Sequence, residues 1–347
     1  MNLMIVTQAV DREDPNLGAF YYWFEMLARR AESVVIIAGR AGSHDLPSHV
    51  AVRVFGETRF GRIGRIWKFL KLFSCHYMNA DAILFHQIPE FVIAAAPFLI
   101  ARKKITALWY AHGKVTWRLR IAERLVGYIF TSSGAGFRLP SKKVHHLGQA
   151  INTDLFRPVP SPQSPVTSST LRMITVGRIA PVKNYETIIS SCAILRQTRP
   201  QAWVLTIVGG PITAGDRIYA EKIKALIREK KLEHYVHFYG DRGYSEIPEI
   251  LREHDMFLNA SATGSLDKAV LEAMACGLTT LTSNEAYRAI LPSRYFLEHP
   301  SAEFLVERIK QLAGEPRPNA ALRAIVLRDH ALERTIEKMR VLLVTTV

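Results

Sequence analysis

The stretch LRMITVGRIAPVKN (171–184) begins as a short apolar run, turns at Gly177, and leads into a segment with helical spacing. Similar apolar runs recur along the chain: LMIVTQ (3–8), SVVIIAG (33–39), VAVRVF (50–55), DAILFH (81–86), ITALWYAH (105–112), YIFTSS (128–133), WVLTIVGG (203–210), YVHFYG (235–240), MFLNAS (256–261) and LTTLTS (278–283). Continuous apolar strands that alternate with helices indicate parallel sheets covered on both faces. The sequence therefore predicts an α/β protein with doubly wound sheets. In such sheets ligands bind beyond the carboxyl ends of the strands, so we expect a site there.

The length and the proline pattern predict two domains and a terminal helix. A chain of 347 residues is too long for one ordinary core. The Pro- and Ser/Thr-rich stretch 157–170 reads as a linker, which separates residues 1–157 from residues 158–318. A second proline break precedes an amphipathic segment within residues 319–347, which predicts a helix that packs on one domain or crosses back to the N-terminal domain.

The charge predicts an anionic partner. The net charge is +14, and residues 1–157 hold 21 Lys and Arg against 11 Asp and Glu. This balance fits a phosphate-bearing substrate, nucleic acid or an acidic lipid surface. Cys75, Cys192 and Cys276 are widely spaced and suggest neither disulfides nor a zinc site. Neither a signal peptide nor a transmembrane run is evident, so we expect a cytoplasmic protein.

Two strand ends carry groups suited to a diphosphate. After Gly177, the cations Arg178 and Lys183 could lie over one loop. There the Arg178 guanidinium would donate paired hydrogen bonds to a phosphate, and the Lys183 ammonium would act as a point charge. Gly209 and Gly210 would let the backbone approach a ligand at the next strand tip. The alternatives are that Arg178 and Lys183 are ordinary solvated surface cations, and that Gly209 and Gly210 only allow a tight turn after the strand.

The stretch TGSLDKAVLEAMACG (263–277) places a carboxylate in a mostly apolar helix. A helix start near Ser265 would offer free N–H groups to an anion. Lys268 in the first turn opposes the helix dipole unless an anion lies nearby. An ion pair between Lys268 and Glu272 contributes only about 0.2–0.5 kcal/mol, less than burial of an unpartnered carboxylate costs. We therefore expect Glu272 to hold a ligand diol such as a ribose.

Together these stretches resemble the retaining glycosyltransferases of family 4, the group 1 glycosyl transferases, across nearly the whole chain. The resemblance implies two facing Rossmann-like domains, the GT-B arrangement. It implies that Arg178 and Lys183 grip the donor diphosphate, that Glu272 binds the nucleotide ribose, and that nucleobase contacts come from residues 238–244. It also implies transfer with retention of the anomeric configuration. No DxD motif follows a predicted strand, and the two cations could serve in place of a metal ion, so we expect neither a metal nor a cofactor.

One position departs from the family pattern. The first carboxylate of the family's Glu-x7-Glu pair would fall at Gly264. That residue normally touches the donor sugar, so the identity of the sugar is left open. We expect Asp267 to replace it, with Lys268 beside it on the donor side.

In the first domain, four residues follow predicted strands or precede a helix. The resemblance places a His or Asp facing the donor sugar, which favours His112 in WYAHGK (109–114), although a lone His is more often structural. Glu90 and Lys114 are candidates on the acceptor side. Gly18, in the loop 11–20 before a helix, is counted with the donor-binding residues.

Residues 59–78 form a basic amphipathic pattern with Trp and Phe. Such a helix can lie in an anionic membrane surface, where each cation contributes roughly 1 kcal/mol. The alternative is a helix that packs its apolar side on the core and leaves its basic side in water. Both interpretations stay open, and the first would make the protein peripheral on the inner face of the cell membrane.

The predicted function is transfer of a hexose from a nucleotide-diphosphate sugar to a glycan or lipid-linked acceptor. A sugar-nucleotide epimerase of the same fold is the alternative enzyme. A nucleic-acid-binding protein is disfavoured, because the cations are dispersed and no recognition helix or aromatic–basic sheet face is evident.

Overall fold

The computed structural model describes residues 1–347 except 101–103, 160–169, 199–201, 262–263 and 345–347. Residue contacts divide the chain into two units. The first unit comprises Met1–Asn152 together with His330–Val347, and the second comprises Thr153–Asp329.

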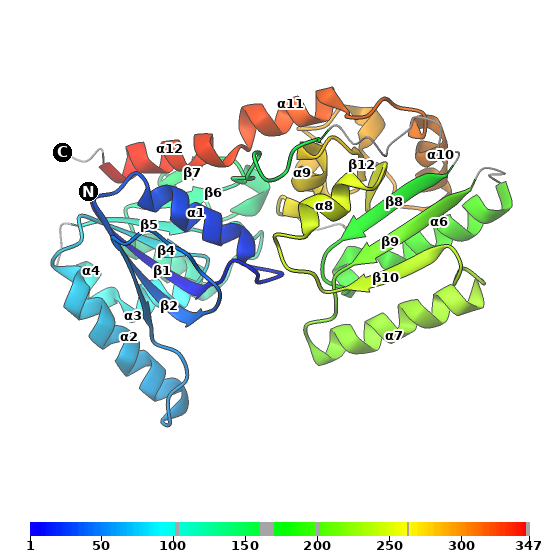
Figure 1. Ribbon diagram of the computed structural model, residues 1–347. Coiled ribbons are helices and arrows are strands. Elements are labelled where there is room, and N and C mark those ends of the chain that lie inside the picture. Colours follow the sequence, from blue (N-terminus) through cyan, green and yellow to red (C-terminus); the bar gives the residue numbers. More distant parts are fainter. Residues whose placement is uncertain (101–103, 160–169, 199–201, 262–263, 345–347) are drawn as a thin grey trace. The chain divides into compact units, whose positions relative to one another are not determined.

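The first unit is built on a parallel sheet with the order β3-β2-β1-β4-β5-β6-β7 (Figure 1). Its strands are β1 (Asn2–Val10), β2 (Ser33–Ala41), β3 (Val50–Val54), β4 (Ala82–His86), β5 (Ile105–Trp109), β6 (Tyr128–Thr131) and β7 (Val144–His146). Its helices are α1 (Gly18–Ala28), α2 (Gly61–Tyr77), α3 (Pro89–Ala94), α4 (Ala96–Ile100), α5 (Trp117–Leu125) and α12 (Leu332–Val344).

Alternate residues of β1 supply the two cores of this unit. Leu3 and Ile5 join a cluster with α1 and α12, whereas Met4 and Val6 join a cluster with α2, α3 and α5. Strand β1 is buried on both faces because side chains alternate across a sheet and helices cover each side.

The second unit has a five-stranded parallel sheet with the order β10-β9-β8-β11-β12. Its strands are β8 (Leu171–Val176), β9 (Trp203–Val208), β10 (Val236–Gly240), β11 (Met256–Asn259) and β12 (Thr279–Thr282). Its helices are α6 (Tyr185–Thr198), α7 (Ala214–Glu229), α8 (Ile247–Arg252), α9 (Lys268–Ala275), α10 (Ala302–Leu312) and α11 (Ala320–Asp329). Each predicted apolar run contains one strand, and the predicted fold class is confirmed. The short strand β7, with only three residues, gave no such run.

The division between the units differs from the sequence expectation. It falls at Asn152–Thr153, five residues before the predicted boundary at 157/158. The reason is that residues 153–158 are bound to the second unit: the Arg252 guanidinium donates to the carbonyls of Leu155 (2.7 Å) and Arg157 (2.9 Å), and Phe156 is fully buried. The central part of the predicted linker, 160–169, lies outside the described residues.

The predicted C-terminal helix is two helices. α11 packs on α9 of the second unit. α12 buries Ile336, Met339 and Leu343 in the α1 cluster of the first unit. The break lies at His330–Ala331, where Ile151 pairs with Ala331 and its carbonyl accepts from the Leu332 N–H at 2.7 Å.

Helix α2 packs on the core through only part of its apolar side, and the membrane interpretation of residues 59–78 stays a prediction. Phe69 and Phe73 are buried in the core, whereas Ile63, Ile66 and Trp67 are exposed. Among the described residues, no helix has the length and apolar character needed to cross a bilayer. Cys192 and Cys276 are buried as expected of reduced thiols, but Cys75, on α2, is exposed.

Candidate donor-binding site

The loop after β8 requires glycine because two backbones meet there. Gly177 has φ +144° and Gly209, after β9, has φ +120°. A Cβ on Gly209 would lie 2.3 Å from the Gly177 carbonyl oxygen, closer than atoms can approach. The Gly210 carbonyl accepts from the Ile179 N–H at 3.0 Å, so the two loops are tied together. The glycines therefore let the two strand tips contact each other, and the predicted approach of this backbone to a ligand stays a prediction.

The two cations of this loop are held by different carboxylates. The Arg178 Nε lies 3.8 Å from the Asp216 carboxylate, near the start of α7, and its side chain is partly exposed. Lys183 ends a short 3-10 turn (Pro181–Lys183) and forms an ion pair with Asp267. Arg178 and Lys183 are thus held by carboxylates at the starts of two different helices, α7 and α9, and their shared contact with a diphosphate stays a prediction.

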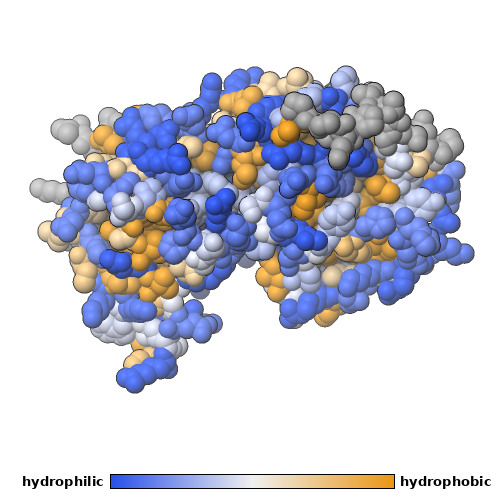
Figure 2. Space-filling view, in the orientation of Figure 1, coloured by the Kyte–Doolittle hydropathy of each residue, from blue (hydrophilic) through white to orange (hydrophobic). Residues whose placement is uncertain are grey.

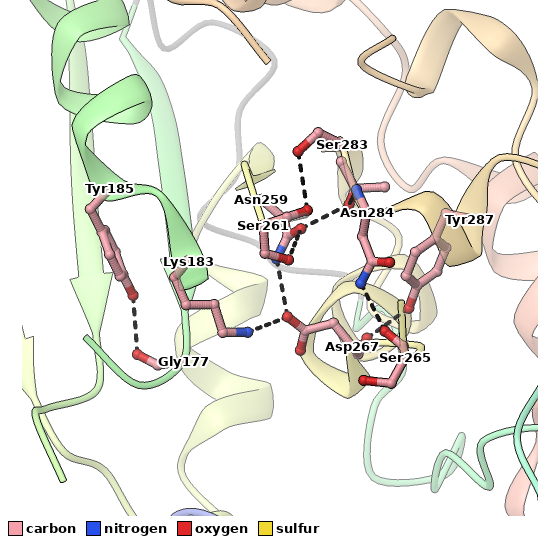
Figure 3. A network of polar contacts seen from close by, with 11 residues as sticks. Gly177, Lys183, Tyr185, Asn259, Ser261, Ser265, Asp267, Ser283, Asn284 and Tyr287 are labelled. Atoms are coloured by element: carbon pink, nitrogen blue, oxygen red, sulfur yellow. Dashed lines mark hydrogen bonds and ion pairs between the residues drawn. The ribbon is translucent and has the colours of Figure 1, made fainter. Parts of the chain in front are cut away.

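Helix α9 begins at Lys268, and Asp267 is its N-cap residue. The predicted cap near Ser265 is therefore corrected by two residues, and Thr263 lies outside the described part of the chain. The Asp267 side chain does not cap the helix. It accepts instead from Lys183 and, at 3.1 Å, from Asn259 Nδ2, and Figure 3 shows both donors pointing at its carboxylate.

Residues at the ends of β11 and β12 fix the segment before α9. Asn284 Nδ2 donates to the Ser265 carbonyl at 2.8 Å, and the Tyr287 hydroxyl donates to the Asp267 carbonyl at 2.7 Å (Figure 3). Asn259 is itself oriented, because its Oδ1 accepts from the Ser261 hydroxyl at 3.0 Å. The start of α9 is consequently positioned by side chains from two neighbouring strand ends.

Glu272 has a partner inside the protein, which the sequence did not reveal. Its carboxylate is buried and accepts a hydrogen bond from the Tyr244 hydroxyl at 2.8 Å. Burial raises the pKa of Glu272, while the Tyr244 hydrogen bond and the charge of Lys268 oppose that rise. Burial likewise lowers the pKa of Lys268, although Glu272 opposes it. The Lys268 ammonium nitrogen is buried even though other atoms of the residue reach solvent.

The first-unit candidates lie at the ends of β4 and β5, apart from Gly18. The His112 ring packs edge-on against Tyr110 with ring centroids 5.5 Å apart, and partial burial lowers its pKa. The Lys114 side chain is exposed, and its carbonyl accepts from the Tyr110 hydroxyl at 2.8 Å. Glu90 forms an ion pair of 3.3 Å with Arg118. Gly18 is buried as the first residue of α1.

Four of the predicted donor residues thus lie around the start of α9 or contact it: Lys183, Asp267, Lys268 and Glu272. Sequence reasoning missed Asn259 and Asn284, and it assigned Tyr244, within residues 238–244, to nucleobase contacts without its hydrogen bond to Glu272. Asn259 and Asn284 end or follow predicted strands, so the strand-end rule could have found both. In the described ranges no group of three or more His, Cys, Asp or Glu side chains could hold a metal ion.

Residues 161–324 match the family model described as "Glycosyl transferases group 1". A curated relative, mannosylfructose-phosphate synthase of Agrobacterium fabrum (strain C58), is 25% identical over 173 residues. That match covers 46% of this chain and 37% of the relative, so the aligned region spans little more than a third of the relative's length. The family match agrees with the predicted resemblance to the group 1 glycosyl transferases over residues 161–324, whereas assignment to family 4 stays a prediction.

Solved structures resemble the whole chain. Anabaena HepE in complex with UDP and glucose has a TM-score of 0.78 at 16% identity, and all of both chains is covered. Sucrose-phosphate synthase from Thermosynechococcus elongatus has a TM-score of 0.77 at 15% identity and 98% coverage of each chain. At these identities the likeness establishes the fold, which is the GT-B type.

Proposed function

From the match of residues 161–324 to the group 1 glycosyl transferases, we propose that this protein transfers a hexose from a nucleotide-diphosphate sugar to an acceptor. The observation that carries the proposal is the convergence of Lys183, Asp267 and the start of α9 at the tips of β8 and β11. The relatives agree with it: HepE is described in complex with UDP and glucose, and with UDP-glucose.

The site suits a departing diphosphate. Cleavage of the anomeric bond places negative charge on the diphosphate, and fixed positive groups stabilise charge where it develops. Lys183 supplies an ammonium group, and the first N–H groups of α9 supply the positive end of a helix dipole. Arg178, whose side chain is partly exposed, would turn from Asp216 toward the phosphates.

Donor binding would exchange the partner of Lys183. In the structure the Lys183 ammonium group forms an ion pair with Asp267. A diphosphate carries more charge than one carboxylate and would take Lys183 over, which frees Asp267 for the sugar hydroxyls. Asp267 would thereby replace the carboxylate that the family carries at the position of Gly264.

Glu272 would bind the nucleotide ribose. Its carboxylate is already held by Tyr244 from the segment after β10, so its orientation is fixed before the ligand arrives. The two hydroxyls of a ribose would donate hydrogen bonds to the lone pairs of the Glu272 carboxylate that Tyr244 does not occupy. Nucleobase contacts would come from the same segment, residues 238–244.

The remaining parts of the proposal follow from the family resemblance. Transfer would retain the anomeric configuration, would need no metal ion, and would use His112 to position the sugar. Glu90 and Lys114 would face the acceptor, a glycan or a lipid-linked sugar. We place the protein in the cytoplasm, in peripheral contact with the inner face of the cell membrane.

A ligand panel tests the donor class. The full chain would be melted alone and with UDP, GDP, their monophosphates and their sugar conjugates. A ligand at 100 times its Kd stabilises the folded state by about 2.7 kcal/mol, which raises Tm by several degrees. One diphosphate and its sugars should raise Tm more than the monophosphate does. Equal shifts with mono- and diphosphates, or none with any nucleotide, would contradict the proposal.

A further inference from the structure

The start of helix α2 exposes apolar side chains that have no place in the core. Phe60, Ile63, Ile66 and Trp67 are 65%, 69%, 51% and 71% exposed. The spacing of the last three places them on one side of the helix. In Figure 1 this end of α2 projects beyond the sheet of the first unit, while Phe69 and Phe73 anchor the other half. Large apolar side chains grouped on an exposed surface mark a contact site.

The same segment is strongly basic. Five cations lie within thirteen residues: Arg59, Arg62, Arg65, Lys68 and Lys71. No acidic residue occurs between Glu57 and Asp81, and in the described part of the chain no carboxylate forms an ion pair with any of the last four. Figure 2 shows this projecting end as mainly hydrophilic surface with paler residues among it. The partner must therefore be both anionic and apolar.

A second exposed tryptophan lies at the same edge of the sheet. Trp117, 62% exposed, begins α5, which like α2 starts at the carboxyl ends of the parallel strands. Helix α3 links the two: the Phe91 ring stacks on Phe69 of α2 at 5.8 Å, and Glu90 pairs with Arg118 of α5 at 3.3 Å. The aromatic and basic surface thus adjoins Glu90, an acceptor-side candidate.

We propose that the start of α2 docks on an anionic lipid bilayer. Phe60, Ile63, Ile66 and Trp67 insert at the level of the headgroups, and Arg62, Arg65 and Lys68 contact the lipid phosphates. Tryptophan and phenylalanine with flanking cations are the side chains that interfacial helices use. A nucleic acid offers the same charge but no apolar layer to receive two isoleucines.

This inference deepens the proposed function, because it names the acceptor class. Acceptor-side residues beside a membrane-bound surface would reach a sugar whose lipid part stays in the bilayer. Docking on the bilayer needs no nucleotide-sugar donor. A negative result in a membrane-binding measurement would therefore contradict the docking and leave the proposed glycosyl transfer untouched.

Vesicle sedimentation tests the docking with the full chain and no nucleotide. Vesicles of phosphatidylcholine with 30% phosphatidylglycerol would be compared with vesicles of phosphatidylcholine alone, at physiological salt. Each basic residue near an anionic leaflet changes partitioning roughly fivefold. We expect binding to the anionic vesicles, at least a tenfold loss for Arg62→Gln/Arg65→Gln, and a several-fold loss for Ile63→Ser.

Matched controls lie on α7 of the second unit. Arg217→Gln/Arg228→Gln removes the same charge from exposed positions, and Ile218→Ser alters an isoleucine that is 76% exposed. Both should bind like the parent. Equal losses in the α2 and α7 variants, equal binding to neutral vesicles, or binding of a random DNA duplex but not of vesicles would each overturn the proposal.

Discussion

The charged side chains at the start of helix α9 are paired within the protein, whereas, in the part of the chain that the structure describes, those at the start of helix α2 are not. At α9, Asp267 is paired with Lys183 and Asn259, and Glu272 with Tyr244. At α2, Arg62, Arg65 and Lys68 form no ion pair with a carboxylate of the described residues, and Trp67 is exposed to solvent. The charges at the start of α9 are paired within the second unit, whereas the cations at the start of α2 are available to an external anionic partner.

The difference reflects how much water each site excludes. A buried carboxylate or ammonium group must be paired, because desolvation costs several kcal/mol when it is not. Such a site is organised in advance and suits a small ligand that replaces one of the existing partners. An exposed cation carries little penalty, so a surface such as α2 needs no internal partner and suits a broad external one.

The largest expected effect is a difference in folding stability between substitutions in the buried half and in the exposed half of α2. Phe73→Ala removes a fully buried ring and should lower the free energy of unfolding by about 3–5 kcal/mol. Trp67→Ala, on the exposed half, should change it by no more than about 0.5 kcal/mol. Urea unfolding measures both. A large loss for Trp67→Ala would mean that the exposed half packs on the protein after all.

The second prediction concerns the α9 site. Lys183→Ala should reduce transfer from the correct donor about 100-fold, because it removes a positive group aimed at the departing diphosphate. The matched control is Lys222→Ala, which breaks a 3.0 Å ion pair with Glu186 at an exposed position. The control should leave the rate within about twofold, as surface ion pairs contribute little. Equal rates for the two variants would exclude Lys183 from catalysis.

The smallest expected effect is a pH dependence. Burial raises the pKa of Glu272 to about 7. Only the ionised carboxylate can accept from both hydroxyls of a ribose, so donor affinity should weaken as the pH falls through 7. Glu272→Gln should bind about tenfold more weakly above that pH. It should also lose the pH dependence between about pH 8 and 6.

Calorimetry at several pH values would measure this effect, and Glu272→Gln corrects for protonation of the nucleotide itself. Lys268 and Asp267 face the same carboxylate, so Lys268→Met serves as a second comparison. If the parent and Glu272→Gln follow one pH curve, Glu272 does not touch the nucleotide.

The sequence predicted the strands and the fold class because buried parallel strands are nearly continuous apolar runs. It misplaced the division between the units because a proline-rich composition says where a chain lacks regular structure, not which side it packs against. Phe156 and the carbonyls that Arg252 binds belong to the second unit through long-range contacts, and local pattern carries no such information.

Within the site, sequence reasoning selected residue types but could not pair them. It took Glu272 to be without an internal partner, and Tyr244, 28 residues earlier, supplies one. It grouped Lys183 with Arg178 by their spacing, whereas each is held by a carboxylate from a different helix start. Side-chain direction after a strand end depends on neighbouring strands, and their order is set by the tertiary fold.

The return of α12 to the first unit has a consequence for how the protein is made. Residues of α12 are translated after the whole second unit, yet Ile336, Met339 and Leu343 complete a core that includes Leu3. The hydrophobic face of the first unit is therefore covered only after the intervening unit has been translated. A nascent chain that stops before residue 330 would contain every residue of the second unit and would leave the first unit exposed to chaperones and proteases.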